Sequence, residues 1–345
     1  MKKIFIAVLA VAALASCATD EIVSTPKGAA IGFDEAFVDN STRANDLTAT
    51  NLVDFNVFGT VEKSTKGIIF DGTLVNKTIT NGELSSTWKY TGTQYWIPSA
   101  AYYFVAIAPA SDANWSYNYG TDGDAYSGTI TFENGVGEAN AEQDLLFANV
   151  TRTTDAEIED QPAKVGFSFG HILSRIQFTF INGFDATNNI TLKVENVVLE
   201  GLLPTGTVEV VNGETQEWTA TGTPFNKTFG TALVGTDNIM VAKADATTDH
   251  FYVIPTNVTY TVKFDVVLYQ AGVEIDTYNR QAEVTIDAQK GYSYDVKATL
   301  SAENVSDEDK PLKPIEFDVT SVTGWTPGSM DVTDDVEKIP AQGNN

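Results

Sequence analysis

Short runs in which apolar and polar residues alternate fill most of this 345-residue chain. Clusters of Gly, Asn, Asp and Thr separate the runs, and no long segment repeats its apolar residues with helical periodicity. Residues 52–61 are typical, since Val53, Phe55, Val57 and Val61 share one face. Further strands are predicted at 68–75, 101–108, 127–133, 144–150, 164–170, 173–181, 189–199, 206–211, 250–255, 258–269, 273–278, 282–287 and 291–300. This spacing predicts an all-β chain built from Greek-key sandwiches.

The length of the chain predicts two such domains, because it exceeds what one sandwich needs. Residues 151–163 are polar and acidic and end in a proline and an alanine. We therefore predict an N-terminal sandwich over 44–162 and a C-terminal sandwich over 163–310. Cys17 is the only cysteine, so no intramolecular disulfide can form and stability must come from the core.

The N-terminus predicts export. Lys2 and Lys3 precede an apolar run over 4–13, which is shorter than the roughly 20 residues that a transmembrane helix needs. The following Leu-Ala-Ser-Cys tetrapeptide resembles the lipobox of bacterial lipoproteins. That resemblance implies a signal peptide over 1–16, cleavage before Cys17 and acylation, for instance with palmitate, of the new terminus. The other interpretation, a cysteine inside a simple secretory signal, is disfavoured by its position directly after the small residues.

Charge restricts the partners of the chain. The formal net charge is -25, a field that repels phosphate backbones and anionic lipid head groups. We expect no nucleic-acid partner, and membrane contact only through the lipid anchor. Asp20 and Glu21 follow the anchor closely, similar to the acidic tracts of lipoproteins that reach the outer surface of Gram-negative anaerobes. The predicted address is the outer membrane or cell surface.

A strand is predicted at 30–38, with Ile31, Phe33 and Phe37 on one face. A polar loop over 39–46 follows it and contains Arg43, one of few arginines. Exposed polar loops are where proteases cut, so Arg43 is a candidate processing site.

Strand-like sequence also continues after the predicted end of the second sandwich. Beyond a charged stretch, Ile315, Phe317 and Val319 alternate with polar residues, and after a Thr-Pro-Gly turn signal a second alternation follows with Met330 and Val332. We interpret residues 311–345 as an appendage, and we expect both sandwiches to fold without 312–345 because the last sandwich strand ends near residue 300.

The sequence gives little indication of an enzyme. The chain has two histidines, His171 and His250, both in strand-like contexts and too few for a multi-histidine metal site. We interpret His171 as a partnered residue in or near the sandwich. Nucleophile-elbow, Walker and dinucleotide motifs do not stand out. The acidic loop over 119–126 does not have the ligand spacing of an EF-hand and is predicted to be a turn. We therefore predict no catalytic residue, metal or cofactor.

The order of several segments resembles the fimbrillins, the pilus subunits of Gram-negative anaerobes of the gut and mouth. These segments are the lipobox, the strand followed by Thr42-Arg43-Ala44, the Leu-x-Asp-Phe-x-Val-Phe-Gly-like stretch at 51–59 and the Phe-Ser-Phe-Gly-His stretch at 167–176. The resemblance implies two transthyretin-like sandwiches and cleavage between Arg43 and Ala44 by an arginine-specific protease. Residues 17–43 would then be a lipidated propeptide whose strand leaves a groove.

The resemblance also implies polymerisation by donor-strand exchange. An extended segment from another subunit would fill the groove, and the donor residues would be Ile315, Phe317 and Val319, or Met330 and Val332. Such a head-to-tail contact grows into an extracellular fimbria for adhesion. A stalk subunit is the predicted role because the chain has both a cut site and a tail, although a tip-like role stays open; the receptor is not indicated.

The alternative is a membrane-retained, glycan-binding surface lipoprotein. It would need exposed aromatic rings, and the candidates are Trp88, Tyr90, Tyr95, Trp96, Trp115, Tyr117 and Tyr119. We favour the interpretation that these rings fill the core, where large aromatic side chains are mostly found.

Overall fold

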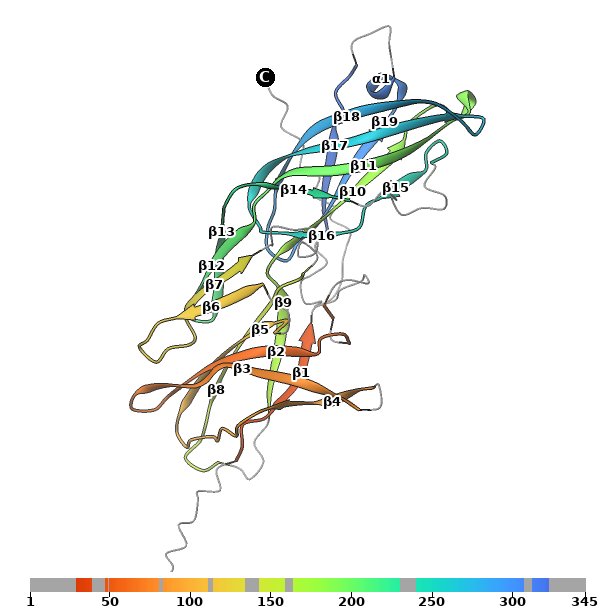
Figure 1. Cartoon of the computed structure of the whole chain (residues 1–345). Coiled ribbons are helices and arrows are strands. Elements are labelled where there is room, and N and C mark those ends of the chain that lie inside the picture. Colours follow the sequence, from red (N-terminus) through yellow and green to blue (C-terminus); the bar gives the residue numbers. More distant parts are fainter. Residues whose placement is uncertain are drawn as a thin grey trace, which may run out of the picture.

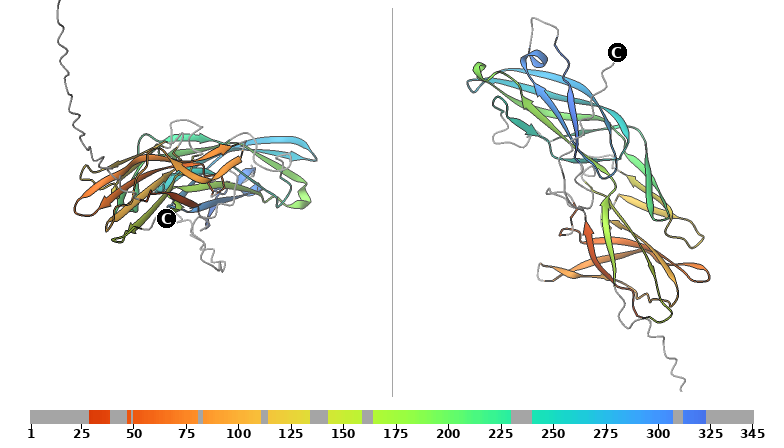
Figure 2. Two further views of the ribbon diagram at one scale, coloured as in Figure 1. Left: turned by 90° about the horizontal axis from the view of Figure 1, so that it is seen from below. Right: turned by 180° about the vertical axis from the view of Figure 1, so that it is seen from behind.

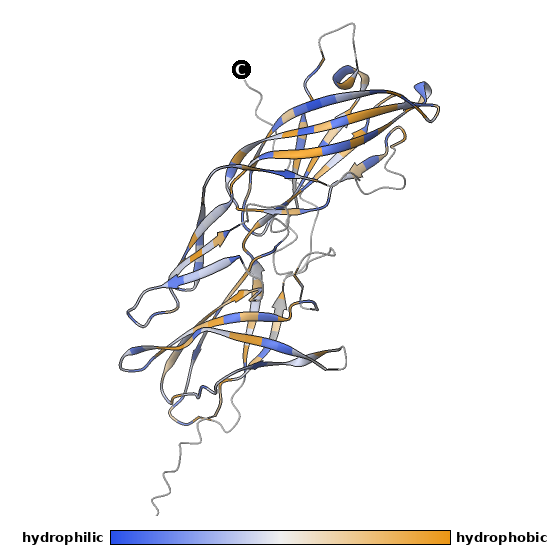
Figure 3. Cartoon of the chain, in the orientation of Figure 1, coloured by the Kyte–Doolittle hydropathy of each residue, from blue (hydrophilic) through white to orange (hydrophobic). Residues whose placement is uncertain are grey.

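The computed structural model describes residues 29–38, 47–48, 50–80, 83–110, 114–133, 143–158, 164–229, 240–306 and 312–322. Strands β1 to β20 form four sheets, and the described helices are two single turns, η1 (Ala186–Asn188) and α1 (Ala302–Val305). Orange and blue alternate along many of these strands, as half-buried sheets require (Figure 3). The all-β prediction is confirmed.

A seven-stranded sheet forms the N-terminal part of the molecule (Figure 1). Its order is β1 (Phe33–Val38), β9 (Val165–His171), β8 (Leu146–Thr153), β5 (Ala101–Ala108), β2 (Asp54–Glu62), β3 (Lys66–Thr80) and β4 (Glu83–Tyr90). The sheet curls until its two ends meet, since the Tyr90 hydroxyl donates to the carbonyl of Ile31 at 2.7 Å. Inside the curl lies an aromatic core that includes Phe55, Phe70, Phe104 and Phe167.

A smaller sheet joins the two halves of the sequence, and we call it the shared sheet. It contains β6 (Trp115–Tyr119), β7 (Gly128–Glu133), β12 (Thr205–Val211) and β13 (Glu214–Thr221), in the order β13-β12-β7-β6. The β7–β12 pairing runs antiparallel from Thr205↔Glu133 to Val210↔Gly128. A second core, which includes Val105, Phe147 and Trp218, lies between this sheet and the outer face of the N-terminal sheet. Strand β5 is therefore buried on both faces.

The C-terminal sandwich consists of two sheets that enclose a third core. One sheet has the order β15 (Asp245–Thr247), β10 (Ser174–Asn182), β19 (Ser293–Leu300) and β20 (Phe317–Val322), and β16 (Phe251–Val253) also pairs with β10. The other has the order β14 (Phe225–Thr228), β11 (Ile190–Leu202), β17 (Asn257–Gln270) and β18 (Val273–Asp287). The shared sheet lies between this sandwich and the N-terminal sheet (Figure 2).

The predicted domain boundary at 162/163 is wrong. Strand β9 follows it, yet β9 pairs with β8 through Leu146↔His171 and with β1 through Phe33↔Val165, so the boundary separates strands of one sheet. Residues 151–153 belong to β8, and the rest of the polar segment leads from β8 to β9. Strands β12 and β13 also depart from the prediction, because they lie in the second half of the sequence but pair with β7.

The description of residues 311–345 as a separate appendage needs correction for its first part. Strand β20 pairs antiparallel with β19 from Phe317↔Ala298 to Val322↔Ser293. Ile315 and Phe317 are 8% and 4% exposed and belong to the core of the C-terminal sandwich. The expectation that the sandwich is complete without residues 312–322 is thus not supported.

Candidate functional site

Strand β1 fills a slot in the N-terminal sheet, and this slot is the candidate functional site. Ile31, Phe33 and Ala36 are 2%, 2% and 8% exposed. The β1 backbone runs parallel to β9, with a register shift between Phe33 and Ala36. Because of this shift Ala36 joins the buried face, which the strict alternation of the sequence did not predict.

Phe33 is the central contact of the slot. Its ring stacks on Phe167 at 5.8 Å between centroids and meets Phe70 and Tyr90 edge-on at 5.5 and 5.4 Å. Phe55 lies edge-on at 6.3 Å. Four aromatic rings from β2, β3, β4 and β9 thus surround one side chain of β1, and such pairs stabilise beyond simple burial.

Hydrogen bonding holds β1 and the residues before it to both ends of the curled sheet. On one side lies the β9 ladder, and on the other the Ile31 N–H donates to the Gln94 carbonyl at 2.8 Å while Trp96 N–H donates to the Ala29 carbonyl at 3.0 Å. Removal of β1 would therefore expose both the edge of β9 and an apolar groove.

The chain after the predicted cut is fastened separately. The Leu47 N–H donates to Asp144 Oδ2 at 3.4 Å, and the same carboxylate lies 2.8 Å from Nδ1 of His171. The side chains of Asp144 and His171 are 1% and 0% exposed. The predicted role of His171, a partnered histidine inside the sandwich, is confirmed. Leu47 therefore has its own attachment to the N-terminal domain, independent of β1.

Of the predicted donor residues in the tail, those up to residue 322 lie within the described part of the chain. Phe317 packs against Phe178 and Phe180, with ring centroids 5.8 and 6.2 Å apart, and Val319 packs on the same core. Lys313 fastens the approach to β20, because its N–H donates to the Glu303 carbonyl at 2.9 Å and its ammonium lies 2.7 Å from the Glu303 carboxylate. Cys17, Arg43, Ala44, Met330 and Val332 lie outside the described residues.

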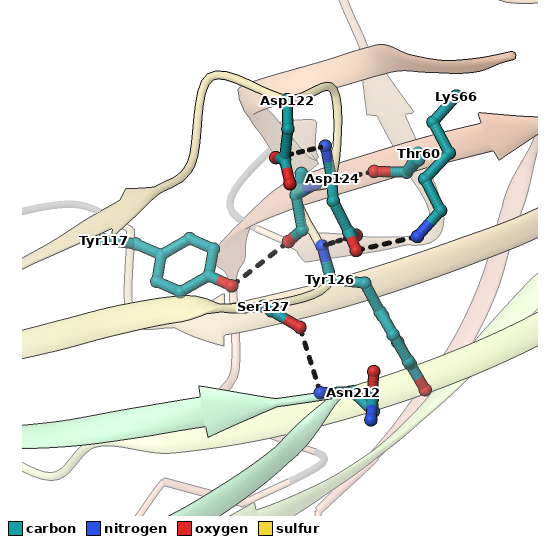
Figure 4. A network of polar contacts seen from close by, with 9 residues as sticks. Thr60, Lys66, Tyr117, Asp122, Asp124, Tyr126, Ser127 and Asn212 are labelled. Atoms are coloured by element: carbon teal, nitrogen blue, oxygen red, sulfur yellow. Dashed lines mark hydrogen bonds and ion pairs between the residues drawn. The ribbon is translucent and has the colours of Figure 1, made fainter.

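The acidic loop between β6 and β7 is a turn, as predicted (Figure 4). Asp122 Oδ1 accepts the Asp124 N–H at 3.3 Å, and the Asp124 carboxylate pairs with the Lys66 ammonium at 2.9 Å. This hydrogen bond raises the pKa of Lys66. The loop is further held by the Ala125 N–H, which donates to Thr60 Oγ1 at 2.7 Å. Across the described residues, no group of three or more His, Cys, Asp or Glu is placed to hold a metal ion.

Most of the aromatic residues that the alternative, glycan-binding function would need on the surface are packed inside the protein. Trp88, Trp96 and Tyr117 are buried, and Trp115 donates its indole N–H to the Pro109 carbonyl at 2.7 Å. Tyr95 is exposed, at 53%. Burial of the indole rings favours the core interpretation over a carbohydrate-binding surface.

Comparison with known proteins places these features in a family. The family model described as fimbrillin-like matches residues 42–325. The chain belongs to this fimbrillin-like family. No curated protein matches the sequence.

One solved structure agrees with the family at the level of the fold, and a second is reported beside it for comparison. A fimbrial protein from Bacteroides vulgatus has a TM-score of 0.58 and 18% identity, over 86% of this chain and 99% of that one. A fimbrial assembly protein from Parabacteroides distasonis has a TM-score of 0.43 and 15% identity, over 85% of this chain and 95% of that one. In the part of this fimbrillin-like chain that the structure describes, no helix is long and apolar enough to cross a membrane.

Proposed function

We propose that this fimbrillin-like protein is a structural, non-enzymatic subunit of a cell-surface fimbria. It is exported as a lipoprotein, cut after Arg43 and polymerised when a neighbour's strand replaces β1. The observation that carries the proposal is the slot itself: one short strand, just ahead of the residues that the family model matches, supplies Phe33 to a cage of four rings.

The packing of the sheet supports removal of β1 without unfolding. The groove lies on the inner face, whereas Val105, Ile107 and Phe147 on the outer face pack against the shared sheet. Leu47 keeps its bond to Asp144. The sheet would therefore remain folded with its groove open.

The distribution of arginines supports a single cut. The chain has four, and Arg152, Arg175 and Arg280 lie in β8, β10 and β18. A protease must take the cut segment into its cleft, and the backbone hydrogen bonds of these strands oppose its removal from the sheet. Arg43 instead stands in a polar stretch between two strands of the sequence.

For the donor we favour the end of the tail, with Met330 and Val332, over Ile315, Phe317 and Val319. The last three already contribute to the core of their own subunit, so transfer of β20 to a neighbour would empty one core to fill another. A donor side chain that is exposed to water before the exchange contributes about 2 kcal/mol of favourable free energy when it becomes fully buried.

Arg43→Ala is expected to leave a monomeric precursor that retains β1. We would treat purified chains that start at residue 18 with an arginine-specific protease and follow fibres by electron microscopy and ladders by electrophoresis. Arg43→Lys is the matched control for charge and should also resist. Wild-type amounts of fibre from Arg43→Ala would contradict the assigned cut.

Cys17→Ala is expected to abolish acylation and outer-membrane delivery while both domains fold, because residue 17 lies ahead of β1 in sequence. Incorporation of radiolabelled palmitate and membrane fractionation measure this. A neighbouring Ser16→Ala variant keeps a small residue before the cysteine and should be labelled normally. Equal labelling of Cys17→Ala would exclude the lipobox.

A further inference from the structure

The connection between the two domains is short and rigid. Only Ile172 and Leu173 separate β9 from β10, and they are 4% and 0% exposed. Ile172 N–H donates to the Leu145 carbonyl at 3.0 Å, and the Trp218 indole donates to the Ile172 carbonyl at 2.7 Å. The β7–β12 pairing bridges the same junction. Tension applied to β9 therefore passes directly into the start of β10.

Strand β10 passes this tension to β19 across a long parallel ladder. The ladder has registered pairs from Arg175↔Ser293 to Asn182↔Leu300, without a bulge. Two side-chain bonds reinforce it, from Arg175 Nε to Ser293 Oγ at 2.9 Å and from Thr179 Oγ1 to Asp295 Oδ1 at 2.7 Å. Strand β10 is loaded at its first residue, next to β9, and β19 is loaded at Leu300, where the chain continues towards the tail.

This geometry is one of shear. Parallel strands pulled from opposite ends slide along each other, so all the hydrogen bonds of the ladder resist together. Strand β20 is not loaded in shear, because its C-terminal end, Val322, lies opposite Ser293, the start of β19. When this end is pulled towards the Leu300 end, β20 opens one pair at a time.

We propose that the parallel β10–β19 pair is the load-bearing clamp of the subunit and that β20 yields before it. The proposal rests on the proposed function, in which neighbours pull on the groove beside β9 and on the tail. It adds a mechanical role to strands that take no part in strand exchange. The β1–β9 pair is also parallel, but its ladder is shorter and is interrupted by a register shift.

Single-molecule force spectroscopy on monomeric chains that start at residue 18, with handles at both ends, tests the clamp. We expect β20 to detach at low force, β1 to slide next, and the C-terminal sandwich to break last and at the highest force. Thr179→Val removes one cross-strand bond at nearly constant volume and should speed that last rupture roughly fivefold at constant force, the effect of one lost hydrogen bond.

The control is a chemically matched change in a pair that carries no load. Thr259 and Thr285 share a hydroxyl bond of 2.7 Å between β17 and β18, and Thr285→Val should leave the last rupture unchanged. Ser293→Ala is a second clamp variant, so failure of one variant to fold does not end the test. The proposal is overturned if the sandwich breaks at a lower force than β1, or if Thr179→Val and Thr285→Val have the same effect. Because only monomers are pulled, the result is independent of whether the cut chain polymerises.

Discussion

Deletion of residues 312–345 is expected to destabilise the C-terminal sandwich strongly, whereas deletion of 323–345 leaves it folded. The longer deletion removes β20 with Ile315 and Phe317, which are 8% and 4% exposed. Loss of a buried Ile side chain costs about 2–5 kcal/mol and loss of a buried Phe side chain about 3–5 kcal/mol, so we expect a loss of at least about 5 kcal/mol. That is a large part of the roughly 5–15 kcal/mol that stabilises a typical domain.

Urea denaturation followed by tryptophan fluorescence and circular dichroism measures this loss. The double variant Ile315→Ala/Phe317→Ala should reproduce most of it in the full-length chain. Its control is Glu316→Ala/Asp318→Ala, since both acidic residues are exposed and alternate with the buried pair. If the two shortened chains were equally stable, β20 would not be needed for the fold. Ile315, Phe317 and Val319 would then again be candidates for the donor strand.

The same comparison separates donation from stability. A chain without 323–345 should be folded, should be cut at Arg43 and should accept a neighbour's strand, but should not donate one. Added to intact protein, it should shorten fibres in proportion to its amount. Fibres of normal length would place the donor within the residues that this chain retains.

Much of the fold could be predicted from the sequence, because alternation reports a half-buried strand directly. The runs that became β2, β9, β10, β17 and β19 all have apolar residues on one face, and β5 has them on both. Strands such as β4 and β13 escaped prediction because they are polar edge strands, and Trp88 and Trp218 are their only buried large apolar residues among those described. A period-two pattern needs more than one buried position to be visible.

The wrong domain boundary has a different cause. Local polarity marked residues 151–163 as a linker, but a connection between two strands of one sheet has the same composition. The pairing of β7 with β12 links residues far apart in sequence, and only the packing around Trp218 and Tyr252 shows that the halves share a core. No local signal carries that information.

The candidate site was predictable in part. Ile31 and Phe33 were placed on the buried face of a first strand, and both are buried. The ring cage around Phe33 was not predictable, because its members come from four strands spread over residues 55–167. Similarly, the tail pattern showed that Ile315 and Phe317 would enter a core, but it could not show that the core belongs to the same chain.

Phe33→Ala in the released strand is expected to weaken its hold on the cut subunit at least 100-fold. Truncation of a buried Phe costs about 3–5 kcal/mol, and each 1.4 kcal/mol is a factor of ten in affinity. Phe33 meets Phe55, Phe70, Tyr90 and Phe167, so its loss leaves a cavity that the rigid sheet cannot close. If strand exchange drives assembly, the same change should speed it, because the slot empties sooner.

A labelled peptide of residues 29–43 measures the effect without disturbing the subunit. The cut, unlabelled subunit is mixed with the wild-type peptide, or with its Phe33→Ala or Asp34→Ala form, and binding and release are followed by fluorescence anisotropy. Asp34 is the control because its carboxylate is exposed and lies 3.8 Å from the Lys164 ammonium, a surface pair worth about 1 kcal/mol or less. Asp34→Ala should therefore bind almost as well as the wild type. Equal affinities for all three peptides would mean that the ring cage does not determine occupancy of the slot, and the ladder on β9 alone would have to hold whatever strand replaces β1.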